Sequence, residues 1–298
     1  MGERRVYPKN APAGRGWQPA QPWHGHATRC AVPGRAVDSQ RLSRENARQP
    51  PVHTLSYATA PVPIRDDLRA AHARAWSTLG RAGTWWSGAE RVAIAAEVRA
   101  AASCALCRAR LAALSPYTIA GRHDGPGILV APAIEAVHRI TTDPGRLKRQ
   151  WYDELLAAGL DDESYVELVG LVVTVLGTDS FCRALSVPLH PLPAPEFGVP
   201  KRVRPAAARD EGAWVPSIPS GAARGADADL YADIPGRVPN VIRALSLVPD
   251  ALRTLKDLGA AHYMTTAEMT DLRHGRSLDR AQMELIAGRV SALRQCFY

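Results

Sequence analysis

The sequence has no run of about eighteen consecutive apolar residues, the length that a membrane-spanning helix requires. Its first ten residues, MGERRVYPKN, also lack the apolar core of a secretory signal. Both absences favour a soluble, cytoplasmic protein without a membrane partner. The chain is nevertheless 46% hydrophobic over 298 residues, which is enough apolar material for two ordinary domains and disfavours a wholly disordered protein.

Aromatic residues are scarce, and only three of them are phenylalanines. No aromatic residue is interleaved among clustered basic residues. The net charge of +8 comes mostly from one end, because residues 1–53 hold nine basic and three acidic side chains. The rest of the chain is close to balanced. A charge that is confined to a tail, without stacking aromatics, does not predict a nucleic-acid partner.

Cysteines are also few, and their odd number argues against a disulfide framework and for a reducing compartment. The five are Cys30, Cys104, Cys107, Cys182 and Cys296. Two of them form a C-x-x-C pair, Cys104-Ala105-Leu106-Cys107. In a reducing compartment such a pair more often indicates redox or metal chemistry than a structural crosslink.

No strand pattern of convincing length occurs, so we predict an all-α fold. Residues 1–60 carry Pro and Gly at short intervals and are expected to form a disordered basic tail. Helical periodicity then predicts a first domain over residues 61–190. A Pro/Ala/Gly-rich linker over 191–235 and the start of a second helical domain over 236–298 follow.

Several helix boundaries have local signals. Ser87 and Glu90 stand three apart before VAIAAEVRAAASC, as a capping box requires, and Gly159 is a candidate C-cap. The segment SYVELVGLVVTVLGTDSFCRAL is apolar around most of its circumference and is expected to be a buried central helix in which Cys182 packs as a small apolar group. Pro249 and Asp279 mark the starts of later helices.

The two halves of the helical region show a short internal repeat. When Cys104 is set opposite Cys296, an offset of 192, four apolar positions coincide. The matched pairs are Ile94 and Ile286, Ala95 and Ala287, Val98 and Val290, and Ala100 and Ala292. Each copy therefore ends in a cysteine after a similar apolar helix, which favours duplication of one helical unit.

These residues resemble the AhpD-like proteins of the carboxymuconolactone decarboxylase superfamily, within it the alkylhydroperoxidase-related (seleno)proteins. The resemblance covers roughly residues 60–298 and is most specific in RAQMELIAGRVSALRQCFY, which is similar to the family motif E-x(11)-C-x-x-C-x(3)-H, with Glu284 twelve residues before Cys296. Other similar phrases are TWWSGAERVAIAAEVRAAASCALC, EAVHRITTDPGR and RALSLVPDALR. The resemblance implies two AhpD-like helical units, an oligomeric assembly and thiol-dependent peroxide reduction.

The sequence departs from the family pattern after Cys296-Phe297-Tyr298, because the second redox residue and the following His are absent. In this group the second redox position can be selenocysteine, whose UGA codon is read as a stop. We therefore expect a truncated translation in which selenium would follow Tyr298. A different codon there, or no downstream frame with a nearby His, would overturn this expectation.

In the intact family site the second cysteine or selenocysteine attacks the peroxide, and the first cysteine resolves the product. The resemblance thus implies that Cys296 is a resolving thiol. It also implies that Glu284 accepts a proton through a relay that includes His. The alternative is that Glu284 is a solvated helical residue.

The first unit has a complete C-x-x-C but lacks the family's proton relay, because Leu111 replaces His and Val92 replaces Glu. Glu90 and Glu97 lie fourteen and seven residues before Cys104, near one helical face, and could substitute if the helix is continuous. Glu90 already has a capping role. Both readings of the cysteine pair therefore stay open: redox-active or disulfide-forming, and reduced and structural.

No cofactor or metal is predicted from the sequence. Zinc is disfavoured because no second C-x-x-C or H-x(3)-H lies at suitable spacing. The histidines outside the tail, His123, His138, His262 and His274 among them, are isolated in sequence and are expected to be ordinary surface or packed residues. Trp85-Trp86 is expected to anchor a helix entry against the core.

The resulting functional hypothesis is an AhpD-like enzyme that reduces hydrogen peroxide or organic hydroperoxides. Its partners would be a thioredoxin-like or other dithiol reductant and further copies of the chain in a homo-oligomer. Catalytic candidates are Cys104 and Cys107 in the first unit and Glu284 and Cys296 in the second. The alternatives are a non-redox enzyme of the decarboxylase or isomerase type, and a structural, oligomerising protein with a degenerate site.

Overall fold

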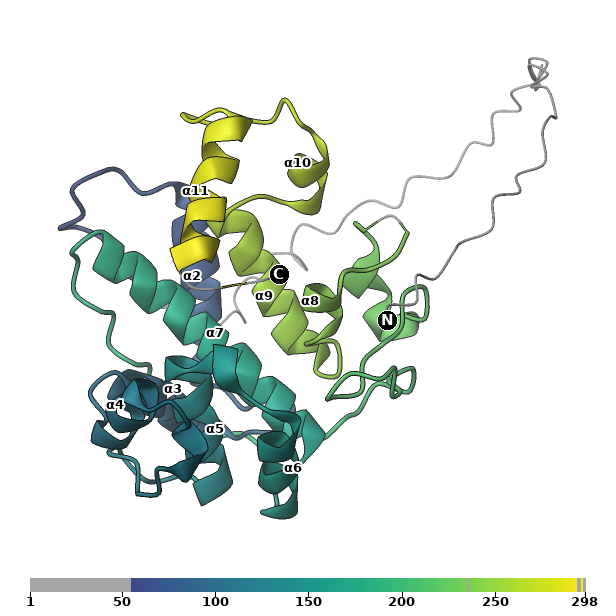
Figure 1. The fold of residues 1–298 in the computed structure, drawn as a ribbon. Helices are drawn as coiled ribbons and strands as arrows, with labels where there is room; N and C mark the ends of the chain where they lie inside the picture. The colour runs from purple at the N-terminus through teal and green to yellow at the C-terminus, as the bar shows by residue number, and fades with distance from the viewer. Residues whose placement is uncertain (1–54, 235, 294–295, 297–298) are drawn as a thin grey trace, which may run out of the picture. The chain divides into compact units, whose positions relative to one another are not determined.

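The computed structural model describes residues 55–234, 236–293 and 296. The expectation for the basic tail falls almost entirely on residues 1–54, which lie outside the described part. Within the described residues the chain forms α-helices and short 3-10 turns (Figure 1), and β structure is limited to an isolated bridge between Arg209 and Ser217. The predicted all-α class is confirmed.

The helices fall into two groups, one before and one after the Pro/Ala/Gly-rich segment. Those before the Pro/Ala/Gly-rich segment are α2 (Asp66–Leu79), α3 (Gly88–Ala101), α4 (Ala105–Ala112), α5 (Ala131–Thr142), α6 (Arg149–Ala157) and α7 (Asp162–Ala184). Those after it are α8 (Asn240–Arg243), α9 (Pro249–His262), α10 (Thr266–Thr270) and α11 (Arg280–Leu293). The 3-10 turns are η1 (Pro116–Thr118), η2 (Pro144–Arg146) and η3 (Gly225–Tyr231).

Local chemistry sets several of these boundaries as predicted. At the start of α3 the Glu90 amide donates to the Ser87 hydroxyl over 3.3 Å, and the Ser87 amide donates to the Glu90 carboxylate over 2.8 Å, which completes the capping box. After α6, Gly159 has a positive φ of 98°, and the amides of Gly159 and Leu160 donate back to Leu156 and Leu155. This is the Schellman arrangement that favours glycine.

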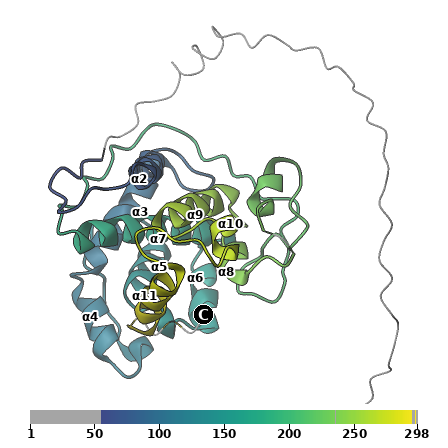
Figure 2. The same ribbon diagram turned by 90° about the horizontal axis from the view of Figure 1, so that it is seen from above.

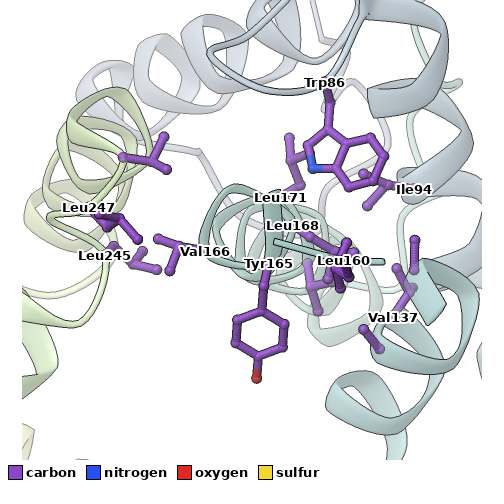
Figure 3. Packing of buried hydrophobic residues seen from close by; sticks show 14 of the residues in the cluster. Trp86, Ile94, Val137, Leu160, Tyr165, Val166, Leu168, Leu171, Leu245 and Leu247 are labelled. Carbon is purple, nitrogen blue, oxygen red and sulfur yellow. The ribbon is translucent and has the colours of Figure 1, made fainter. Parts of the chain in front are cut away.

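Helix α7 is the centre of the core. It packs against α3, α5 and α9, which lie beside it in Figures 1 and 2. Figure 3 shows Ile94 and Val137 on one side of α7 and Leu245 and Leu247 on the other. By length and composition alone α7 could span a membrane, but two thirds of its most apolar window, 67%, is buried inside the protein. Its apolar circumference is therefore accounted for by core packing.

Two ion pairs fix α3 to α7. Arg91 in the first turn of α3 contacts the carboxylate of Glu167, whose side chain is 3% exposed. At the other end, Arg99 donates two hydrogen bonds of 2.9 and 2.8 Å to Asp179. Glu97 lies on the same helix between these two contacts, so its position is set by both.

The helices after the Pro/Ala/Gly-rich segment contact those before it. Helix α9 packs against α2 and α7. At the α7 contact a Cβ added to Gly170 would lie 2.8 Å from the Cβ of Ala251, so glycine permits this close approach. The described residues belong to one compact unit. The predicted boundaries at 190 and 235, and the duplication itself, stay predictions.

A second apolar cluster lies between α2, α7 and α9 and contains a group of aromatic and imidazole rings. Tyr57 is 6% exposed, and its hydroxyl contacts His72 Nδ1, so the folded part begins before residue 61. His72 Nε2 lies 2.5 Å from His262 Nε2, and His190 packs edge-on against Tyr57. Cys182 is fully buried in this cluster, as predicted for a small apolar side chain.

This histidine group predicts acid sensitivity. Burial, reinforced by the neighbouring His262 and His190, lowers the pKa of His72 from 6.5 to about 4. Burial lowers the pKa of His190, and burial with nearby Arg65 lowers that of His262. Because the unfolded chain binds more protons below pH 6.5, the free energy of unfolding should fall as pH drops from 6.5 toward 4, by on the order of 3 kcal/mol for His72.

Urea denaturation between pH 7 and pH 4, followed by circular dichroism, measures this loss. A His72→Phe variant should show a shallower pH dependence, because one proton-uptake site is gone. An unchanged slope in that variant would contradict the assignment to His72.

Candidate functional site

Four side chains that are far apart in sequence meet beside the start of α4. They are Cys104 and Cys107 from the C-x-x-C, His123 from the loop after α4, and His138 from α5. One sulfur or imidazole nitrogen from each lies within 4.8 Å of all the others. Both cysteines and His138 are buried, and the His123 side chain is only 6% exposed. The C-x-x-C is thus part of a buried Cys2His2 cluster.

Cys104 lies in the short segment between α3 and α4 and is the N-cap of α4. Its sulfur accepts the backbone amide of Asp124 over 3.4 Å and that of Cys107. Burial by itself raises the pKa of this thiol, but the hydrogen bonds from the two amides, together with His123 and the Cys107 side chain, bring it below its usual value. The same contacts would stabilise a thiolate at Cys104.

His138 connects Cys107 to a buried carboxylate. Its Nδ1 lies 3.3 Å from the Cys107 sulfur, and its Nε2 lies 3.0 Å from Glu97 Oε2. The side chains of Glu97 and His138 are both fully buried, and burial is the main cause that lowers the pKa of His138. Because an ionised carboxylate only accepts hydrogen bonds, Nε2 carries the proton, and neutral His138 presents an unprotonated Nδ1 to Cys107.

The second oxygen of Glu97 has its own partner. Glu97 Oε1 accepts the backbone amide of Gly127 over 2.8 Å. Gly125 also passes so close that an added Cβ would lie 2.1 Å from Glu97 Oε2. The loop between α4 and α5 therefore packs directly against the carboxylate and helps to fix its orientation.

His123 has the matching arrangement on the other side of the cluster. Its Nδ1 lies 3.5 Å from each cysteine sulfur, and its Nε2 lies 2.8 Å from Glu135 Oε2. Glu135 also accepts from Arg110 and from Trp151 Nε1. Burial lowers the pKa of His123, but the contacts with the sulfurs and Glu135 outweigh it and raise the value to about 10. Although burial raises the pKa of Glu135, His123 and Arg110 hold it at about 2.

The two histidines therefore differ in charge. His123 is cationic at neutral pH and supports a thiolate, whereas His138 is neutral and has a free lone pair. Environments that push the pKa values of two neighbouring groups apart are typical of sites that use one as a cation and the other as a base. A cavity of about 780 Å³ adjoins the cluster and is lined by Glu97, His123, Glu135 and Trp151, among others.

The structure corrects one expectation about this unit, that its histidines are ordinary isolated residues. Leu111, the position of the family's His, is 55% exposed and takes no part in the cluster. His123 and His138 were expected to be ordinary isolated residues. They lie sixteen and thirty-one residues after Cys107 in sequence, but both contact it in the structure. Of the two substitute carboxylates considered, Glu97 reaches the cluster, whereas Glu90 serves the capping box. Glu135 was not anticipated, and no local spacing signals it.

The other residues singled out from the sequence lie elsewhere. Trp86 is buried and its Nε1 donates to the Ser164 carbonyl over 2.9 Å, which confirms an anchoring role at the entry to α3. His262 joins the His72 group, and His274 lies 3.5 Å from Glu268.

At the predicted second site, Glu284 on α11 accepts from the Tyr263 hydroxyl over 2.7 Å and pairs with Arg280 over 2.8 Å. Cys296 is exposed. In the described part of the chain no hydrogen bond joins Glu284 to Cys296. A catalytic role for these two residues stays a prediction.

Comparison of this chain with known protein families, with curated proteins and with solved structures finds no match. The chemistry of the Cys2His2 cluster is therefore the basis for assigning a function.

Proposed function

We propose that this chain is a dithiol oxidoreductase that reduces hydroperoxides at Cys104 and Cys107 and is reduced again by a thioredoxin-like or other dithiol donor. The observation that carries the proposal is the contact series from Glu97 through His138 to Cys107. The AhpD-like resemblance implies a proton relay of a carboxylate and an imidazole. Glu97 and His138, which are distant in sequence, supply these two groups. A reducing compartment such as the cytoplasm would provide the donor.

The reaction proceeds in two displacements. Cys107 transfers its proton to His138 Nδ1, and the thiolate attacks the terminal oxygen of the hydroperoxide. The O–O bond breaks, Cys107 becomes a sulfenic acid, and the leaving oxygen takes the proton from His138 and departs as an alcohol, or as water when the substrate is hydrogen peroxide. Glu97 keeps His138 in the tautomer that accepts a proton.

Cys104 completes the turnover. Its thiolate attacks the sulfur of the Cys107 sulfenic acid, a disulfide forms, and hydroxide leaves as water after protonation. The donor then returns two electrons and two protons to the disulfide. One hydroperoxide thus consumes two thiols. The placement of Cys104 beside two backbone amides and His123 favours the thiolate that this step needs.

The test uses the full chain, reduced and treated with a chelator, and hydrogen peroxide as the probe, because Cys107 is only 4% exposed and a small oxidant reaches it most easily. Differential alkylation with mass spectrometry should find one Cys104–Cys107 disulfide per peroxide consumed. In Cys104→Ser the reaction should stop at a Cys107 sulfenic acid that a dione probe traps.

Cys182→Ala is the matched control, since this buried thiol lies in another cluster and should not affect the reaction. Two results would contradict the proposal. If Cys104 and Cys107 stay reduced under peroxide, the pair is structural. If a variant with serine at both Cys104 and Cys107 keeps an activity on another substrate, the protein is an enzyme of the non-redox type.

A further inference from the structure

We infer that Cys104, Cys107, His123 and His138 together bind one Zn²⁺ ion. Nothing in this inference requires the cluster to react with peroxide. Two thiolates and two imidazoles are the donor set of tetrahedral structural zinc, and they disfavour the oxygen-seeking cations Mg²⁺ and Ca²⁺.

The separations of the donor atoms fit such an ion. Zinc binds sulfur at about 2.3 Å and nitrogen at about 2.0 Å, so at tetrahedral angles a ligand sulfur and a ligand nitrogen lie about 3.5 Å apart. Three of the four sulfur-to-Nδ1 separations are 3.5, 3.5 and 3.3 Å. All four donor atoms lie within 4.8 Å of one another. The side chains are thus already arranged around a space of the right size.

The orientation of both imidazoles is a second, independent observation. Each directs Nδ1 into the cluster and Nε2 to a carboxylate: His123 to Glu135 at 2.8 Å and His138 to Glu97 at 3.0 Å. A zinc-bound histidine almost always donates its other N–H to such a partner, which fixes the tautomer and strengthens the ligand. His123, which is cationic without metal, would release its Nδ1 proton when zinc binds. A chance meeting of two histidines and two cysteines would not require this pairing to occur twice.

The Cys104 sulfur also has polar partners. It accepts the backbone amides of Cys107, in the first turn of α4, and of Asp124, in the loop after α4, and these hydrogen bonds would offset part of the charge of a zinc-bound thiolate. Sequence spacing disfavoured zinc only because both histidines are distant along the chain. The structure brings them in from a loop and from α5.

Bound zinc would hold both thiolates and so prevent disulfide formation while it is present. The test therefore separates the two properties. Reduced, metal-free full chain is titrated with Zn²⁺ in competition with a chromophoric chelator, and with Co²⁺, without peroxide. We expect one ion per chain and, with Co²⁺, the visible absorption of a tetrahedral site together with thiolate charge transfer.

Protection of thiols identifies the ligands in the unmodified protein. Zn²⁺ should slow the alkylation of Cys104 and Cys107 at least tenfold, whereas exposed Cys296 should react at an unchanged rate and serves as the internal control. This measurement needs no variant, so it holds even if a substitution impairs folding.

Variants then show how much individual side chains contribute to the affinity for Zn²⁺. Glu135→Gln should weaken Zn²⁺ binding about 10- to 100-fold, as loss of a carboxylate partner does. His123→Ala removes a direct ligand and should weaken it by more, and Cys182→Ala should bind as the parent does. Absent binding, unprotected Cys104 and Cys107, or equal affinity in His123→Ala would overturn the inference. Peroxide reactivity is measured separately on metal-free protein, so zinc binding without oxidation refutes only the proposed redox function, and oxidation without zinc binding refutes only the metal site.

Discussion

Glu97→Gln should slow the peroxide-driven oxidation of Cys107 by about 100-fold while the protein stays folded. Glu97 has two fixed donors, the Gly127 amide and His138 Nε2. Glutamine has one acceptor oxygen, and this oxygen must face the Gly127 amide because the alternative orientation sets donor against donor. The side-chain NH₂ then donates to His138 Nε2, the proton moves to Nδ1, and His138 no longer accepts the thiol proton.

The measurement is the rate of disulfide formation in chelator-treated protein as a function of pH. In the variant Cys107 must lose its proton to solvent instead of to His138, so its rate should depend more steeply on pH than that of the parent. Glu90→Gln is the matched control, two helical turns earlier on α3, and should react like the parent. Equal rates for Glu97→Gln and the parent at neutral pH would remove Glu97 from the mechanism.

Arg91→Met should lower the free energy of unfolding by about 3–5 kcal/mol, because it leaves the buried carboxylate of Glu167 without its cation. The Glu167 side chain is 3% exposed and also accepts the Trp85 amide over 2.6 Å. Burial already raises the pKa of Glu167 even beside Arg91. Methionine retains most of the volume of arginine, so the loss reports charge burial and not a cavity.

A double-mutant cycle checks this explanation. Combining Arg91→Met with Glu167→Gln should recover most of the loss, since glutamine accepts the Trp85 amide without burying a charge. Urea denaturation of the four proteins provides the values. If the two substitutions are simply additive, the ion pair does not couple α3 to α7.

The elements that the sequence predicted well are those determined by neighbours along the chain. Ser87 and Glu90 form their capping box across one helical turn, and Gly159 ends α6 where its positive φ is needed. The central position of α7 followed from its apolar circumference. Glu97 was a candidate because the seven-residue spacing to Cys104 holds on a continuous helix, and α3 is continuous to Ala101.

The rest of the site depends on contacts that no local pattern encodes. His123 and His138 lie on separate segments, and only the packing of α5 against α3 and α4 brings them to the cysteines. The family pattern puts the relay histidine four residues after the second cysteine. In this chain that position is the exposed Leu111. Here the carboxylate of Glu97 comes from α3 and the imidazole of His138 from α5, so spacing along one helix finds Glu97 and misses His138.

The loop between α4 and α5 both completes the cluster and covers it. It supplies His123, the Asp124 amide on the Cys104 sulfur and the Gly127 amide on Glu97. Detachment of this loop would give a bulky reagent a path to the sulfurs, but it would also remove His123 and the Asp124 amide from Cys104. A reagent too large to enter the closed site therefore meets a Cys104 that has lost two of its activating contacts, while His138 on α5 stays beside Cys107.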